Sequence, residues 1–146
     1  MIAQTIQLAL APVFMLVAIG NIMNILSTRL GRVVDRSRHL QARHRDTEGR
    51  DHDMVVIEIR LIDRRIALIG RALLLLVTSG VIIGLTVGLL FVEEIAGLNL
   101  QRVAAATFFI AVTLMMGALA MFLHETRIAT AALRIPKDLL ELDREL

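Results

Sequence analysis

The sequence predicts an all-α membrane protein: three transmembrane helices, a cytoplasmic antiparallel helical hairpin between the first and second, and a short amphipathic C-terminal helix. Two observations lead to this fold class. The chain of 146 residues is 56% hydrophobic with a mean hydropathy of +0.70, which is too apolar for an ordinary soluble domain. Its charge is also segregated, because residues 29–71 hold 11 of the 16 basic residues between segments almost free of charge.

Three apolar stretches are long enough to cross a bilayer, which takes roughly 20 residues of helix. Charged residues such as Arg29, Arg71 and Arg102 mark their ends. We therefore divide the chain into a first transmembrane helix (1–28), a helical hairpin (29–71), the second and third transmembrane helices with a short outer loop at 93–102 (72–123), and a tail (124–146).

The distribution of arginine and lysine predicts the orientation. Segments rich in these residues stay in the cytoplasm, and residues 29–71 are by far the richest. The outer loop carries a single arginine, whereas the tail carries Arg127, Arg134, Lys137 and Arg144. The N-terminus is therefore expected outside and the C-terminus in the cytoplasm.

Residues 29–71 have the pattern of two packed helices. Apolar residues recur every three or four positions on both arms, and a polar turn containing Gly49 separates the arms. The predicted seams consist of Leu26, Leu30, Val33, Ser37 and Leu40 on one arm and Val55, Ile59, Ile62, Ile66 and Ile69 on the other.

Both arms of the hairpin also carry complementary charges. These are Asp35 and Arg36 on the first arm and Asp63, Arg64 and Arg65 on the second. They could form ion pairs across the hairpin or between subunits. The alternative is that they are solvated surface charges, which contribute little to stability.

In the tail, Pro136 interrupts the helical pattern and can begin a new short helix. Leu139, Leu142 and Leu146 would form the apolar stripe of that helix, beside acidic neighbours. We expect it to pack against the hairpin or a neighbouring subunit.

Small residues mark a packing face on the second span. Gly80, Gly84 and Gly88 are four residues apart, a spacing that lets helix backbones approach closely. The spacing does not reveal whether the partner helix belongs to the same chain. Candidate counterparts on the third span are Ala104, Thr107, Ala111 and Ala118.

The first span carries a polar stripe. Projected at 100° per residue, its members fall on one face, and they are Gln7, Leu10, Phe14, Val17, Asn21, Asn24 and Thr28. Amide side chains are costly against lipid, so this face must meet other helices or water. One interpretation is hydrogen bonding between helices. The other is a pore lining with Phe14 or Leu10 as an apolar constriction.

Glu93 and Glu94 follow the second span on the outer side. Repeated around a ring of subunits, they would concentrate cations at the outer mouth of a pore. As single copies they would be ordinary solvated carboxylates.

The sequence argues against an enzyme. No cysteine is present, and no nucleophile–base pair or glycine-rich phosphate loop is visible. His124 and Glu125 end the third span and are expected to anchor it at the interface. The histidines and acids of the hairpin turn lack a defined ligand spacing. We expect no cofactor, no metal site and no nucleic-acid partner.

Two arginine-rich runs resemble a known family. RLGRVVDRSRHL (29–40) and IRLIDRRIALIGRAL (59–73), followed by a glycine-bearing apolar span, resemble the bacterial three-span membrane proteins of domain of unknown function 2721. The resemblance extends from Pro12 to about Arg134. It implies a bacterial inner-membrane protein with its basic hairpin inside, and it implies no activity. The most specific residues are Arg29, Arg32, Val33, Asp35, Arg36, Arg38, Leu61, Arg64, Arg65 and Arg71.

One copy of three spans has little interior in which to bury the polar stripe, the glycine face and the hairpin seams together, so we expect a homo-oligomer. The function we favour is a small homo-oligomeric ion channel whose first span lines the pore. The alternative is a non-conducting scaffold or accessory subunit that acts through its cytoplasmic hairpin. The expected partners are the lipid bilayer, further copies of the chain and inorganic ions.

Overall fold

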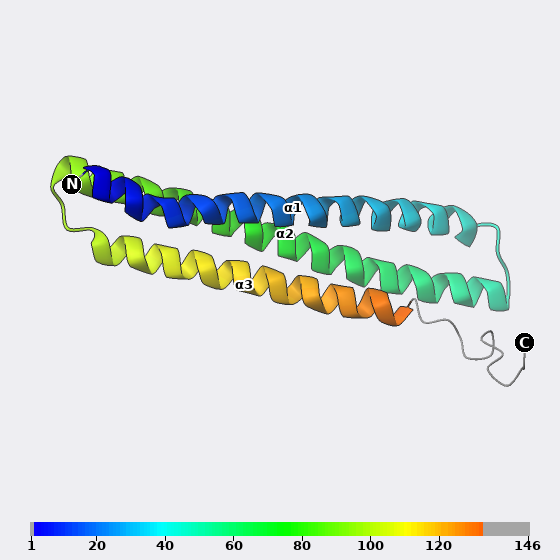
Figure 1. Ribbon diagram of the computed structural model, residues 1–146. Helices are drawn as coiled ribbons and strands as arrows, with labels where there is room; N and C mark the ends of the chain where they lie inside the picture. The colour runs from blue at the N-terminus through cyan, green and yellow to red at the C-terminus, as the bar shows by residue number, and fades with distance from the viewer. Residues whose placement is uncertain (1, 133–146) are drawn as a thin grey trace, which may run out of the picture.

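The computed structural model describes residues 2–132, which form three long helices joined by short connections (Figure 1). The helices are α1 (Ile2–His44), α2 (Arg50–Ala96) and α3 (Gln101–Ala132). Residues 2–132 contain no strand, and each helix includes a stretch long and apolar enough to cross a membrane. The predicted all-α fold with three potential spans is thus confirmed, whereas the predicted C-terminal helix lies outside the described residues.

Both connections are shorter than the sequence pattern indicates. α1 ends at His44 and α2 begins at Arg50, so part of the predicted polar turn forms the first turn of α2. α2 also continues through Glu93 and Glu94 to Ala96, where the predicted outer loop would already have begun. Gly97, with φ 64° and ψ 24°, ends α2 in the left-handed conformation that glycine adopts without strain.

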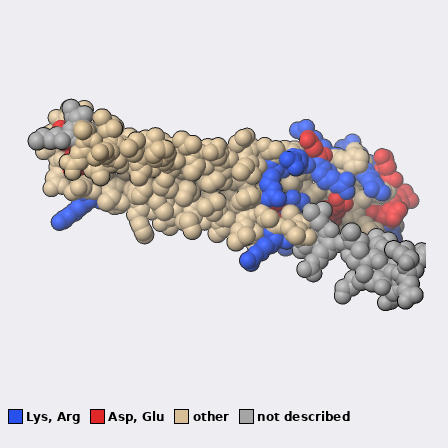
Figure 2. Space-filling model, viewed as in Figure 1, with Lys and Arg blue, Asp and Glu red and all other residues tan. Residues whose placement is uncertain are grey.

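α2 is the central helix of the molecule. α1 and α3 both pack along it, in the opposite direction to α2, and the three helices form an elongated bundle. The connected ends of α1 and α2 extend beyond the described end of α3 (Figure 1). Charged side chains gather at that end, while the middle of the molecule is almost free of them (Figure 2).

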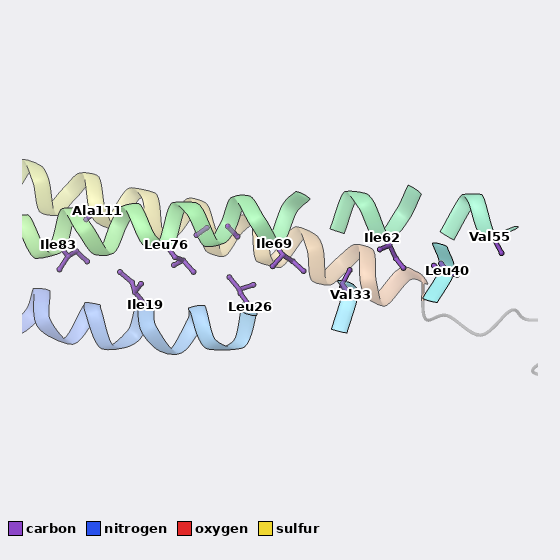
Figure 3. Packing of buried hydrophobic residues seen from close by; sticks show 12 residues of the cluster. Ile19, Leu26, Val33, Leu40, Val55, Ile62, Ile69, Leu76, Ile83 and Ala111 are labelled. Atoms are coloured by element: carbon purple, nitrogen blue, oxygen red, sulfur yellow. The ribbon is translucent and has the colours of Figure 1, made fainter. Parts of the chain in front are cut away.

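The contact between α1 and α2 repeats every seven residues. Buried residues on α1 (Ile19, Leu26, Val33, Leu40) meet a matching series on α2 (Val55, Ile62, Ile69, Leu76, Ile83), as Figure 3 shows. Leu30, Ile59 and Ile66 are partly buried beside them. A strict seven-residue repeat is the pattern of a left-handed coiled coil. The apolar seam predicted for the hairpin is therefore confirmed, and it continues through the apolar part of the molecule.

The contact between α2 and α3 has a different chemistry. α2 presents Ala72, Ser79 and Thr86, each three residues after a member of the first series, to Ala111 and its neighbours on α3. The Ser79 hydroxyl donates to the carbonyl oxygen of Ala111 at 2.7 Å, and the Thr86 hydroxyl donates to Thr107 Oγ1 at 2.8 Å. Small residues and hydroxyl groups are the usual means by which helices associate in membranes.

Candidate functional site

The three helices meet at one buried carboxylate, Glu125 of α3. Its side chain is 0% exposed, and each oxygen accepts a hydrogen bond from an arginine of another helix. Arg29 of α1 donates from Nη1 to Oε2 at 3.0 Å, and Arg65 of α2 donates from Nε to Oε1 at 2.9 Å. We call these three residues the Glu125 cluster.

The helix register explains why these charges converge. On α3, Glu125 lies seven residues after Ala118, which packs against α2. On α2, Arg65 lies seven residues before Ala72 on the line that faces α3. The repeat that buries small residues in the apolar part of the molecule therefore brings opposite charges together at its end.

The surroundings of the cluster compensate for burying the carboxylate. An unpaired buried charge is costly, and two arginines, one at each oxygen, satisfy this group. Arg29 Nη1 also donates to Thr126 Oγ1 at 2.9 Å, and its guanidinium carbon lies 5.2 Å from the centre of the Phe122 ring, a cation–π distance. Arg29 and Arg65 remain 32% and 24% exposed. The cluster carries one net positive charge.

This cluster is not evident from the residue types in the sequence. They predict that Glu125 anchors α3 at the membrane boundary and that Arg65 takes part in ion pairs of the hairpin. The signal that identifies Glu125 is the seven-residue spacing from Ala104 through Ala111 and Ala118. That spacing places the carboxylate on the buried face of α3.

Of the predicted hairpin charges, Arg36 does pair across the hairpin. Its Nε and Nη2 atoms donate to Glu58 Oε1 at 2.8 and 2.7 Å, and both side chains are about half exposed. Asp35, Asp63 and Arg64 are exposed and form no ion pair among the described residues. Pairing of these three between subunits stays a prediction.

The polar stripe of α1 faces away from α2 and α3. All seven members, from Gln7 to Thr28, are exposed in the single chain. Thr28 Oγ1 donates to the carbonyl oxygen of Asn24 at 2.9 Å within the helix. Among the described residues, the side chains of Asn21 and Asn24 form no hydrogen bond, and both residues are exposed. Whatever satisfies these amides lies outside the described residues.

The glycine face of α2 is only partly used within the chain. A Cβ atom on Gly80 would lie 3.9 Å from side-chain atoms of Leu16 and Ile19 on α1. At Gly84 and Gly88 it would meet nothing within 4 Å. Of the expected counterparts on α3, Ala111 and Thr107 contact α2, but at its Ser79 and Thr86 rather than at its glycines.

The outer acidic pair lines a polar cavity at the far end of the bundle from the hairpin. This cavity of about 210 Å³ is also lined by Gln4, Thr5 and Gln101. Thr5 Oγ1 donates to Glu94 Oε2 at 3.1 Å, whereas Glu93 Oε2 is buried without a hydrogen-bond partner in the described structure. An apolar cavity of about 230 Å³ adjoins it, sharing Leu8, Leu90 and Gln101.

Two histidines lie together near the hairpin turn. The rings of His44 and His52 are 4.3 Å apart between centroids, and His52 Nδ1 lies 3.1 Å from the carbonyl oxygen of Thr47. Within residues 2–132, no three histidine or acidic side chains are grouped closely enough to hold a metal ion.

The chain has the features of an α-helical multi-pass membrane protein. It has three long apolar helices, small residues and hydroxyl groups where α2 and α3 pack, and a buried charge cluster where all three helices meet. Residues 9–135 match the profile of the family described as protein of unknown function (DUF2721), and the chain belongs to that family. The matched region includes all members of the Glu125 cluster. No curated protein and no solved structure matches the chain.

Proposed function

We propose that this protein is a small homo-oligomeric ion channel in which α1 lines the pore. The observation that carries the proposal is the exposure of the whole α1 stripe, including Asn21 and Asn24. α2 packs against another face of α1, and α3 packs against α2. Two amides in an apolar span cannot face lipid at low cost. They require either water or another molecule.

A closed ring of subunits meets this requirement. Symmetry repeats the stripe around an axis, so a few polar residues in each chain become a continuous polar lining. Phe14 and Leu10 would form the apolar constriction, and Glu93 and Glu94 would hold cations near the outer mouth. The arginine-rich hairpins would surround the inner mouth. Inorganic ions are the expected cargo.

The charge distribution supports an orientation with the N-terminus outside and the C-terminus in the cytoplasm, and the family resemblance implies the bacterial inner membrane as the location. Eleven arginines lie in residues 29–71, whereas the connection between α2 and α3 has no basic residue before Arg102. The hairpin would then be cytoplasmic.

One observation favours a second function, a non-conducting scaffold or accessory subunit. Met54, Ile57 and Leu61 form an exposed apolar stripe on α2, within the charged end of the molecule and away from the α1 seam. Such a patch is typical of a surface that contacts another protein. In this case Asn21 and Asn24 would be buried against a helix of that partner or of a second copy.

Ion flux through purified protein in liposomes tests the channel, with gradients of K⁺, Na⁺, Ca²⁺ and Cl⁻. We expect Asn21→Leu to reduce flux and Phe14→Ala to increase it, because the first removes a polar lining group and the second widens the constriction. Phe109→Ala on α3 is the matched control, since Phe109 is 72% exposed and Phe14 68%. Flux that Phe14→Ala and Phe109→Ala change equally would contradict a pore along α1.

Cysteine scanning distinguishes the two functions, because the chain has no native cysteine. In a channel, cysteines at positions 14, 17, 21 and 24 should react with a charged, water-soluble thiol reagent, and cysteines at 19 and 109 should not. In a scaffold, positions 21 and 24 should be as protected as position 19. Absence of flux together with that protection would reject the channel.

A further inference from the structure

A groove of about 370 Å³ lies between α2 and α3, and its lining is partly charged and partly apolar. Arg64, Arg71 and His124 supply basic groups, Asp63 supplies one carboxylate, and Leu68 and Ile128 supply an apolar floor. We call this the interfacial groove.

The groove lies at the end of the apolar part of the molecule. Arg71 directly precedes the apolar stretch of α2, and His124 directly follows that of α3. The neighbouring Arg65 and Glu125 turn inward and pair with each other. Arg64, Arg71 and His124 are exposed, and none of them has an ion-pair partner among the described residues. Their charge and hydrogen-bond donors are therefore available to a ligand.

We propose that the interfacial groove binds the phosphate group of an anionic phospholipid. Arginine guanidinium groups are strong phosphate ligands, and basic pockets between membrane helices recognise lipid headgroups in this way. The His124 imidazole adds a further donor. Leu68 and Ile128 can contact the first carbons of an acyl chain, and the exposed Leu74 continues the apolar surface into the membrane.

The composition of the groove favours a lipid over free phosphate. Arg64, Arg71 and Asp63 together carry one net positive charge, which balances the single negative charge of a phosphodiester. Inorganic phosphate would leave the apolar floor without a partner.

The test uses the full chain, purified in neutral detergent and titrated with phosphatidylglycerol, with bound lipids counted by native mass spectrometry. Replacing both arginines (Arg64→Gln with Arg71→Gln) should weaken phosphatidylglycerol binding about 30-fold, roughly fivefold for each arginine. The matched control is Arg32→Gln with Arg38→Gln. It removes the same charge from exposed positions of α1 that do not line the groove, and it should leave the affinity nearly unchanged.

Parallel titrations with phosphatidylcholine and with inorganic phosphate complete the test. The proposal requires the native chain to prefer phosphatidylglycerol to phosphatidylcholine. Equal weakening in the two double variants would show only general surface attraction and would overturn the proposal. So would displacement of the lipid by an equal concentration of inorganic phosphate. If the double variant does not fold, Arg71→Gln alone should still weaken binding about fivefold.

Discussion

The face of α2 that packs against α1 and the face that packs against α3 carry different kinds of residues. The face toward α1 carries large aliphatic side chains at every seventh position, from Val55 to Ile83. The face toward α3 carries small or polar residues at the same seven-residue spacing: Arg65, Ala72, Ser79 and Thr86. Both faces belong to one continuous helix, so the difference lies in the partner and not in the local backbone.

The two contacts of α2 are stabilised by different physical effects. The α1 seam continues past the apolar stretch to Val55 and Leu40, where large aliphatic groups are removed from water. The α3 contact lies mostly within the apolar stretch. Lipid is as apolar as leucine there, so close approach and hydroxyl donors stabilise the contact instead. Toward the hairpin, the α3 contact reaches the Glu125 cluster, where charges replace small residues in the same register.

The strongest way to break the α3 face is to remove its buried carboxylate. Glu125→Ala would leave Arg29 and Arg65 without their shared acceptor. We expect it to lower the free energy of unfolding by about 3–5 kcal/mol, the usual cost of breaking a buried ion pair from one side. Unfolding in mixed micelles, followed by circular dichroism, measures this. If Glu125→Ala lowered the free energy of unfolding by less than removal of the half-exposed Arg36–Glu58 pair does, the cluster would not hold the helices together.

The α1 face is tested by Leu76→Ala, at a fully buried position. We expect a loss of about 2 kcal/mol in the free energy of unfolding. This value is at the low end for Leu→Ala substitutions in protein cores. In a membrane, a leucine side chain has apolar surroundings both in the folded protein and in lipid, so the cost comes mainly from the cavity that the substitution leaves. Leu74→Ala, at a position 68% exposed, is the matched control and should be near neutral. Equal effects at positions 74 and 76 would contradict the seam.

The hydroxyl contacts of the α3 face should contribute less. Ser79→Ala removes the bond to the Ala111 carbonyl, and we expect a loss of about 1 kcal/mol. Thr78→Ala is the control, since the Thr78 hydroxyl donates only to the Leu74 carbonyl of its own helix among the described contacts. The same micelle unfolding assay applies. A Ser79→Ala variant as stable as Thr78→Ala would indicate that close packing alone joins α2 and α3.

The smallest effect is expected for the exposed pair at the hairpin. A double-mutant cycle on Arg36 and Glu58 should give a coupling energy of about 0.5 kcal/mol that declines as salt is raised. Unfolding at low and high ionic strength measures it. A coupling energy of the size expected for Glu125, or one insensitive to salt, would place this pair in the same class as the buried cluster.

The fold was largely predictable because two strong signals agree. Charge segregation located the three apolar stretches, and spacings of three and four residues identified the seam from Leu26 to Ile69 that the structure buries. The helix ends were less predictable, because α2 ends at the left-handed Gly97 and not where charge first appears at Glu93.

The candidate site was harder to predict from sequence. A single carboxylate after an apolar run fits a solvated boundary residue equally well, and only the register with Ala118 places Glu125 inside. Glycine spacing likewise predicts a close-packing face on α2 without identifying its partner. Of the three glycines, only Gly80 lies where an added Cβ would come within 4 Å of α1. The exposure of Asn21 and Asn24 follows from where the other helices pack, which the pattern on α1 alone cannot specify.

The length of α1 has a mechanical consequence. As one helix of 43 residues it is about 65 Å long at 1.5 Å per residue. It carries the polar stripe near one end and the arginines of the hairpin at the other. Its internal proline, Pro12, lies on the far side of Asn21 and Asn24 from the hairpin. No proline interrupts the helix from Val13 to His44, so the hairpin arm and the segment that carries Asn21 and Asn24 form one continuous helix without a proline hinge between them.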